Sequence, residues 1–302
     1  MKIYKLIFAS FLVLSLMASC EKYEDYVSDY DYTTAYFGSQ KPLRTIVARD
    51  EMEFEVGVAL GGMREDNGTH EVNFKVDSSL LENIPEAAGF VMLPEAYYTL
   101  GDESNFNIVK DHMRVVNVSL NRETFTADPL AITNTYALPL RITSATLDSI
   151  PGSDLDTATI ESKDITILVV KYISPYHGTY YSKGVQYELD ATGAPVDTIT
   201  FSDENLSQNM TKDFSTLALN IISTNNISAQ ISGKMDLTID NDNAVEIAST
   251  AITVSENNSV YSPEETTIFL DYKFEKSGTM YHTLDTLILR QAPELDLRFD
   301  EW

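Results

Sequence analysis

The side chains that most often carry catalysis are few in this 302-residue chain, and their spacing matches no catalytic motif. The sequence contains no Gly-x-Ser-x-Gly nucleophile elbow and no His-Glu-x-x-His zinc motif. A lone histidine in a β protein is more often a hydrogen-bonded or surface residue than a ligand. The four histidines stand singly in the sequence: His70, His112, His177 and His282. We therefore expect a protein without enzyme activity and without a bound cofactor.

Carboxylates are the one abundant reactive type, with 46 Asp and Glu residues. A glycoside hydrolase needs two of them facing each other across a cleft. Because any two positions could supply that pair, a hydrolase stays open as the less favoured alternative. In the segment TIDNDNAVE (238–246), Asp240, Asp242 and Glu246 offer oxygen ligands of the kind Ca²⁺ prefers, but the glycine and distal Glu of an EF-hand are absent. Asn and Asp also build turns, so we favour a turn here and predict no metal site.

Aromatic residues are the stronger indication of a binding function. Sugar rings present flat apolar faces that pack on aromatic side chains, while their hydroxyl groups need fixed polar partners. The chain has 17 Tyr, 13 Phe and one Trp. We take five residues as candidate ligand contacts: Tyr176, His177, Tyr180, Tyr181 and Trp302. The alternatives are that the tyrosines join two domains and that Trp302 is a terminal anchor packed on a C-terminal barrel.

The only cysteine, Cys20, follows an apolar run that is typical of a secretory signal. Lys2 and Lys5 precede the run LIFASFLVLSLM (6–17), which is too short to span a bilayer because spanning takes about 20 apolar residues. Residues 16–20 resemble a bacterial lipobox, in which the cysteine is acylated and becomes the first residue of the mature chain. We therefore predict a signal peptide at residues 1–19 and lipidation of Cys20.

Acidic residues follow Cys20 directly and dominate the whole chain. Glu21, Glu24 and Asp25 resemble the surface-export signal of Bacteroidetes lipoproteins, and we predict a lipidated acidic tether at residues 20–29 on the outer face of the outer membrane. Without residues 1–19 the chain has 19 basic and 46 acidic side chains, a net charge of −27. Such a charge repels nucleic acid and anionic lipid head groups, so neither is an expected partner.

Alternating apolar and polar residues predict an all-β protein. In the first half, the segments MEFEVGVAL (52–60) and HEVNFKV (70–76) flank turn residues that include Asn67-Gly68, which predicts a hairpin. A short helix is expected at 78–83. Further strands are expected at 33–37, 44–48, 105–109, 114–120, 136–142 and 164–172. Short strands at this density predict an immunoglobulin-like β-sandwich over residues 30–173.

Pro175 and Gly178 interrupt the strand pattern, and we place the domain boundary there. Strands then resume at 184–189, 197–201, 214–222, 228–239, 244–254, 266–275 and 281–290. They predict a C-terminal domain over residues 174–302, either a second antiparallel sandwich or a lipocalin-like barrel. Periodicity does not distinguish these two closures.

Three segments resemble two-domain surface lipoproteins of Bacteroidetes: residues 30–47, 125–144 and 173–184. The resemblance implies an immunoglobulin-like N-terminal domain and a β-rich C-terminal domain, both of the domain-of-unknown-function type. It also implies a place beside SusC/SusD-type transporters in polysaccharide-utilisation loci, and hence glycan binding at the cell surface. Some relatives carry a chitinase-like hydrolase, but its Asp-x-x-Asp-x-Asp-x-Glu motif is missing here, and DLDTATIE (154–161) has the wrong spacing.

The leading functional expectation is therefore a non-catalytic surface lipoprotein that holds glycan for a SusC/SusD-type transporter. An adhesin or assembly component that binds protein is the alternative. Two Asp-Ser/Thr-apolar tripeptides in a turn-rich region also resemble O-glycosylation acceptors of Bacteroidetes, with Ser149 and Thr157 as the candidate residues.

Overall fold

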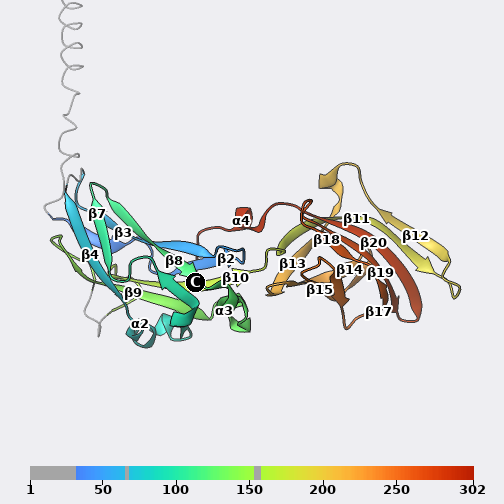
Figure 1. Cartoon of the computed structure of the whole chain (residues 1–302), viewed down its shortest axis with the longest axis horizontal. Helices are drawn as coiled ribbons and strands as arrows, with labels where there is room; N and C mark the ends of the chain where they lie inside the picture. The colour runs from blue at the N-terminus through green and yellow to red at the C-terminus, as the bar shows by residue number, and fades with distance from the viewer. Residues whose placement is uncertain (1–31, 65–67, 153–157) are drawn as a thin grey trace, which may run out of the picture.

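The computed structural model describes residues 32–64, 68–152 and 158–302. The predictions that concern the signal peptide, Cys20, Glu21, Glu24, Asp25 and Thr157 lie outside these residues. Two β domains follow one another along the chain (Figure 1), as the alternation of residue types predicts.

Two sheets face each other in the N-terminal domain. The smaller sheet has the order β1 (Thr34–Phe37), β3 (Glu53–Gly61), β8 (Met113–Leu120) and β6 (Tyr98–Leu100). The larger sheet has the order β21 (Asp300–Glu301), β2 (Pro42–Val47), β10 (Ile165–Ile173), β9 (Tyr136–Ala145), β4 (Thr69–Val76) and β7 (Asn105–Val109), with β5 (Val91–Met92) also on β9. Their inner faces share one apolar core, which includes Phe54, Phe74 and Phe106.

The predicted hairpin between residues 52–60 and 70–76 is wrong, although both strands exist. β3 pairs with β1 and β8, whereas β4 pairs with β7 and β9 in the other sheet. Each strand has alternating residues and one buried face. That alternation fits two strands in opposite sheets, with their apolar faces packed across the core, as well as it fits two strands paired in one sheet. The connection between them therefore crosses from one sheet to the other.

Strand β10 is buried on both faces, which explains its continuous apolar sequence ITILVV. One face joins the sandwich core, and the other packs under helix α2 (Ser79–Asn83), where Leu80 and Ile84 are fully buried. The short helix expected at 78–83 is thus confirmed as a cover for the second face. The other helical turns that the structure describes in this domain are η2 (Pro85–Ala87), η3 (Glu95–Tyr97), α3 (Arg122–Thr126) and η4 (Pro129–Ile132).

One strongly curled sheet forms most of the C-terminal domain. Its order is β16 (Val245–Ala248), β15 (Ile231–Ile239), β14 (Ile221–Ser228), β13 (Met210–Ala218), β11 (Gly178–Leu189), β20 (Thr279–Leu289), β19 (Thr267–Lys276) and β17 (Thr253–Asn257). β12 (Pro195–Phe201) also pairs with β11, and β18 (Val260–Ser262) with β19. The short helical turn η6 (Leu206–Gln208) precedes β13.

The two ends of this sheet meet, so the barrel alternative describes it better than the sandwich. The Tyr261 N–H donates to the Asn243 carbonyl oxygen at 2.8 Å, and the Val245 N–H donates to Ser259 O at 3.0 Å. A β-bridge joins Ala244 to Val260 between these bonds. The sheet is therefore nearly closed along a seam between β16 and β18.

Two strand predictions in this domain merge elements that the structure separates. The predicted strand 214–222 spans the end of β13, a turn at Leu219 and Asn220, and the start of β14. The predicted strand 244–254 contains β16 and β17 with a bend between them. Apolar residues flank both breaks, so the alternation carries no sign of the turn except Asn220, whose type favours turns.

The last ten residues leave the barrel and return to the N-terminal domain (Figure 1). After helix α4 (Pro293–Asp296), strand β21 pairs antiparallel with β2, joining Asp300 to Leu43 and Glu301 to Pro42. Because β2 is otherwise an edge strand, the tail covers that edge. By strand pairing, the end of the chain thus belongs to the N-terminal sheet.

Candidate functional site

The linker between the domains, residues 174–177, is held by hydrogen bonds to the barrel. The Ser174 N–H donates to Thr216 Oγ1 at 2.9 Å, and the Tyr176 N–H donates to Ser174 Oγ at 3.2 Å. The Tyr180 hydroxyl, buried in the barrel core, donates to the Tyr176 carbonyl oxygen at 2.8 Å. These bonds fix the backbone that presents the Tyr176 side chain.

Tyr176 packs edge-on against Tyr261 of β18, with ring centroids 4.9 Å apart and an interplanar angle of 80°. This is the geometry that aromatic pairs prefer. Burial raises the pKa of both hydroxyl groups, so both are protonated and able to donate hydrogen bonds at neutral pH. Tyr261 lies on the barrel seam, so the closure of the barrel and the placement of this pair depend on the same contacts.

The tyrosine pair lines a cleft of about 660 Å³ between the two domains. That volume falls within the roughly 300–1,000 Å³ of small-ligand sites. Its lining comes from three places, the N-terminal domain, the linker and the barrel seam: Ala48, Arg49, Asp50, Glu51, Arg122, Pro175, Tyr176, Asn243, Tyr261 and Pro263. An apolar wall with charged and amide groups around it is the composition expected of a site for a polar, ring-shaped ligand.

Two arginines lie in this cleft in different states. The Arg49 guanidinium is held by Glu294 of α4 through two hydrogen bonds of 2.5 and 3.3 Å, and this bond raises its pKa. Arg122 opens helix α3, whose backbone is fixed by the Asn121 cap. Among the described residues, the Arg122 side chain makes no hydrogen bond or ion pair, and its Nε is buried without an acceptor.

The sequence-predicted ligand residues separate in the structure. Tyr176 lines the cleft, but Tyr180 is only 1% exposed within the barrel core, and Tyr181 points to the outer face of β11. His177 lines a separate cavity of about 290 Å³, and its Nδ1 lies 3.2 Å from the Thr216 N–H, which donates to it. Burial lowers the pKa of His177, with the Lys171 charge acting in the same direction.

Trp302 is an anchor, but on the N-terminal domain and not on the barrel. Its ring meets Phe90 edge-on with centroids 4.8 Å apart, and its Nε1–H donates to the Ile167 carbonyl oxygen at 2.7 Å. Lys41 Nζ lies 5.9 Å from the ring centroid. Trp302 therefore does not line the cleft. It fastens the C-terminal tail to the sandwich.

The two remaining local predictions concern the segment around Asp240 and the side chain of Ser149. The Asp240 carboxylate accepts from the Asp242 and Ala244 N–H groups at 2.9 and 2.8 Å, which is a turn. Ser149 is half-buried, and its hydroxyl donates to Thr33 O at 3.4 Å. Over residues 32–64, 68–152 and 158–302, no group of three His, Cys, Asp or Glu side chains is placed to hold a metal ion. None of the helices in those ranges is long and apolar enough to cross a membrane.

Sequence reasoning missed Arg49, Arg122 and Tyr261. They are separated by more than 70 residues from one another, and no local pattern links them. One signal was available for Arg122, because arginine is uncommon in a chain with 46 acids and 21 basic residues. That signal concerns charge alone and says nothing about position in space.

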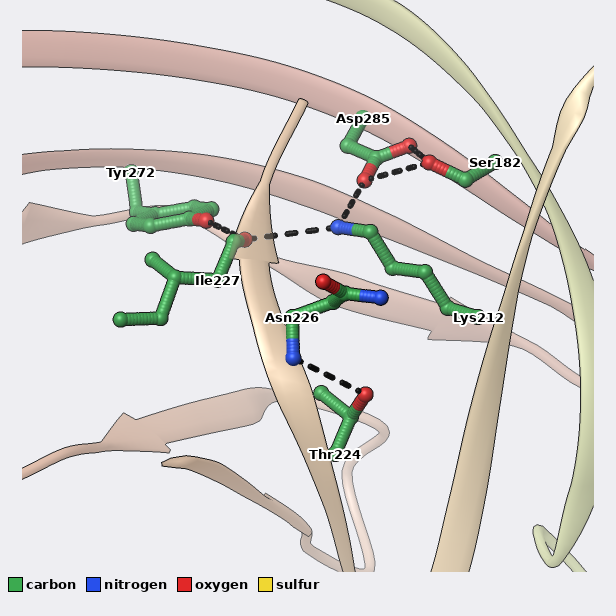
Figure 2. Close-up of polar contacts among 7 residues, drawn as sticks. All are labelled: Ser182, Lys212, Thr224, Asn226, Ile227, Tyr272 and Asp285. Atoms are coloured by element: carbon green, nitrogen blue, oxygen red, sulfur yellow. Dashed lines mark hydrogen bonds and ion pairs between the residues drawn. The ribbon is translucent and has the colours of Figure 1, made fainter. Parts of the chain in front are cut away.

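The barrel interior holds a second polar cluster (Figure 2), and it is closed by its own contacts. Lys212 Nζ lies 2.8 Å from Asp285 Oδ2, with the two side chains 1% and 0% exposed. The Ser182 hydroxyl donates to the same carboxylate at 2.9 Å. Lys212 and the Tyr272 hydroxyl both donate to the Ile227 carbonyl oxygen, at 3.4 and 2.5 Å. The four side chains of this cluster come from β11, β13, β19 and β20, so the contacts hold these strands together.

Comparison with known proteins supports this two-domain description. A family model described as a '-like, N-terminal domain' matches residues 29–149. A second model, described as '-like, C-terminal', matches residues 166–288. The chain belongs to this two-domain family. No curated protein matches the sequence.

Three solved structures from Bacteroides ovatus are similar to the chain to different degrees. One of unknown function is 25% identical, covers 87% of this chain and 95% of its own, and superposes with a TM-score of 0.69. A second of unknown function is 14% identical over 90% of this chain and all of its own, with a TM-score of 0.42. A third, named for carbohydrate binding, is 11% identical over 84% of this chain and 79% of its own, with a TM-score of 0.32. The first supports the fold, and the other two, with TM-scores below 0.5, carry no argument.

Proposed function

We propose that this protein is a non-catalytic, surface-exposed lipoprotein that binds glycan in the cleft between its two domains. The observation that carries the proposal is the Tyr176–Tyr261 pair, which forms an aromatic wall in a cleft of about 660 Å³. Arg49, Asp50 and Asn243 add hydrogen-bonding groups around that wall. Aromatic faces for sugar rings and fixed polar groups for hydroxyls are what glycan binding requires.

The cleft is also suited to holding ligand without transforming it. Its two carboxylates, Asp50 and Glu51, are consecutive residues of one exposed segment, and the described residues that line the cleft from the barrel include no carboxylate. A glycosidase instead places its two carboxyl groups on opposite sides of the scissile bond, about 5–9.5 Å apart. We therefore expect no release of reducing ends from any glycan that binds.

The test is isothermal titration of residues 21–302 against a broad polysaccharide panel. We expect binding without hydrolysis, and we expect Tyr176→Ala to weaken it about tenfold, which corresponds to about 1.4 kcal/mol. Tyr181→Ala is the matched control, because Tyr181 does not line the cleft and lies between the buried Tyr180 and Ser182, so it faces the outer side of β11. No binding across the panel, together with capture of a protein partner that added glycan does not displace, would favour the adhesin or assembly alternative.

The lipid anchor and the surface location form a separate part of the proposal. They rest on Cys20 behind its apolar run and on Glu21, Glu24 and Asp25 behind the cysteine. A diacylglycerol and an amide-linked chain provide more than one anchor, which is what stable membrane attachment takes. We expect Cys20→Ser to abolish lipid labelling and release the protein into the periplasm.

Replacing the three acids with Ala should preserve lipidation but remove protease accessibility in whole cells, and unchanged accessibility would refute the export signal.

We propose that the protein hands its glycan to a SusC/SusD-type transporter, which would be its protein partner. Co-purification from outer membranes tests it, with the Cys20→Ser protein as the control that lacks the anchor.

A further inference from the structure

The cleft contains a half-buried cation, Arg122, that no described residue neutralises. Arg122 is half-buried, and its guanidinium makes no hydrogen bond or ion pair with any described residue. Its Nε is fully buried without an acceptor. A buried donor that loses its water without gaining a partner is destabilising, and more so when it is charged. In a chain with 46 carboxylates, this arrangement is unusual.

The position of Arg122 places this guanidinium beside the aromatic wall. Arg122 lines the same cleft as Tyr176 and Tyr261, and its charge acts on the Tyr176 hydroxyl. The backbone of Arg122 is well fixed, because the Thr126 hydroxyl donates to its carbonyl oxygen at 2.7 Å and the Asn121 side chain caps the helix. The nearby Arg49, in contrast, donates from Nε and Nη2 to the Glu294 carboxylate, which neutralises its charge. Of the two arginines that line the cleft, Arg122 is therefore the one whose charge no described carboxylate neutralises.

We propose that the cleft selects an acidic sugar, and that Arg122 binds its carboxylate while Tyr176 and Tyr261 contact the ring. The planar guanidinium matches a carboxylate with two parallel hydrogen bonds. This inference rests on the glycan-binding function proposed above and names its ligand class.

The surrounding charge restricts the ligand further. Asp50 and Glu51 line the same cleft, and the chain without its first 19 residues has a net charge of −27. A densely charged polyanion would be repelled at long range, and a divalent phosphate would meet two carboxylates at close range. A single carboxylate on an otherwise neutral glycan carries less negative charge and therefore reduces both penalties. The expected ligand is thus a glycan with isolated uronic acid or similar carboxylated residues.

The test compares acidic glycans with their carboxyl-reduced forms, in which each carboxylate becomes a neutral hydroxymethyl group on the same ring. The panel covers sparsely charged members such as glucuronoxylan oligosaccharides, densely charged oligogalacturonates, and neutral glycans. We expect a sparsely charged member to bind wild-type protein best, and its reduced form to bind about 10- to 100-fold more weakly, the range for a charge-assisted hydrogen bond.

Variants identify the residue responsible. Arg122→Gln should weaken the acidic form to the level of the reduced form, while leaving the affinity for the reduced form unchanged. Arg122→Lys keeps the charge but not the fork, and should fall between the two. Arg114→Gln is the matched control, because Arg114 is an exposed arginine of β8 outside the cleft. Circular dichroism and the unfolding midpoint establish that each variant folds.

The outcomes separate this inference from the function it depends on. One outcome would overturn the acidic-sugar inference and leave glycan binding intact. In that outcome, neutral or carboxyl-reduced glycans bind the wild-type protein as tightly as acidic ones, their binding depends on Tyr176, and Arg122→Gln does not change it. Preference for oligogalacturonate over the sparsely charged members would overturn the isolated-carboxylate part. An absence of binding to every member of the panel would refute both proposals together.

Discussion

The barrel interior and the interdomain cleft both collect charged side chains, but they treat them differently. In the barrel, Lys212 and Asp285 neutralise each other at 2.8 Å, and Ser182 and Ile227 supply the remaining hydrogen bonds. In the cleft, the Arg122 guanidinium has no hydrogen bond or ion pair with any residue that the structure describes, although acidic residues are abundant in the chain. A paired charge that is out of contact with solvent serves the fold. An unpaired one at the rim of a cleft reduces stability and is the kind of departure from self-consistency expected at functional sites.

The largest effect should come from breaking the barrel pair. Lys212→Met leaves Asp285 buried without its counter-charge, so we expect a loss of about 3–5 kcal/mol in the free energy of unfolding. Urea denaturation followed by circular dichroism measures it. The double variant Lys212→Met/Asp285→Leu should recover most of the loss, because a well-packed apolar pair can replace a buried ion pair. If the double variant were as unstable as the single one, packing around Lys212 would matter more than its charge.

A smaller effect should follow from releasing the tail. Trp302→Ala removes the hydrogen bond to Ile167 and the contact with Phe90, and we expect a loss of about 1–3 kcal/mol in the stability of the N-terminal domain. Because the tail also carries Glu294, which holds Arg49 in the cleft, glycan affinity should fall as well. The barrel pair should be unaffected, so the loss should appear as an earlier unfolding of the N-terminal domain, measured by hydrogen exchange.

Glu294→Gln is the control for that experiment. It removes the exposed ion pair with Arg49 but leaves Trp302 in place, and exposed pairs contribute about 0–1 kcal/mol. A destabilisation as large as that of Trp302→Ala would show that the ion pair, and not the indole anchor, fastens the tail.

The smallest effect on stability should come from the cleft. Arg122→Gln exchanges an unpaired charge for a neutral amide, so we expect the free energy of unfolding to stay within about 0.5 kcal/mol of the wild type or to rise. Chemical denaturation under the conditions used for Lys212→Met provides the comparison. A loss of 2 kcal/mol or more would mean that Arg122 has a structural partner, and the contrast between the two regions would disappear.

The positions of most strands follow from the sequence because the alternation of side chains depends only on the local backbone. β4 and β10, for example, lie within one residue of the predicted ranges. Strand pairing does not follow in the same way, since an amphipathic strand buries its apolar face equally well in either sheet. The predicted hairpin between β3 and β4 fails for this reason. The turn at Asn220 was not predicted for a different reason, because apolar residues flank it on both sides and continue the strand pattern.

The candidate site shows the same division. The sequence alone indicated an aromatic-rich boundary, and Tyr176 does line the cleft. It also determined the abundance of acids and the identity of the two-domain β scaffold. Only the tertiary structure decided that Tyr180 lies inside the barrel, that Trp302 anchors the tail on the other domain, and that Tyr261 and Arg122 join Tyr176. The physical reason is that these contacts join residues far apart in the chain through the closure of the barrel and the return of the tail, and local residue patterns carry no information about either.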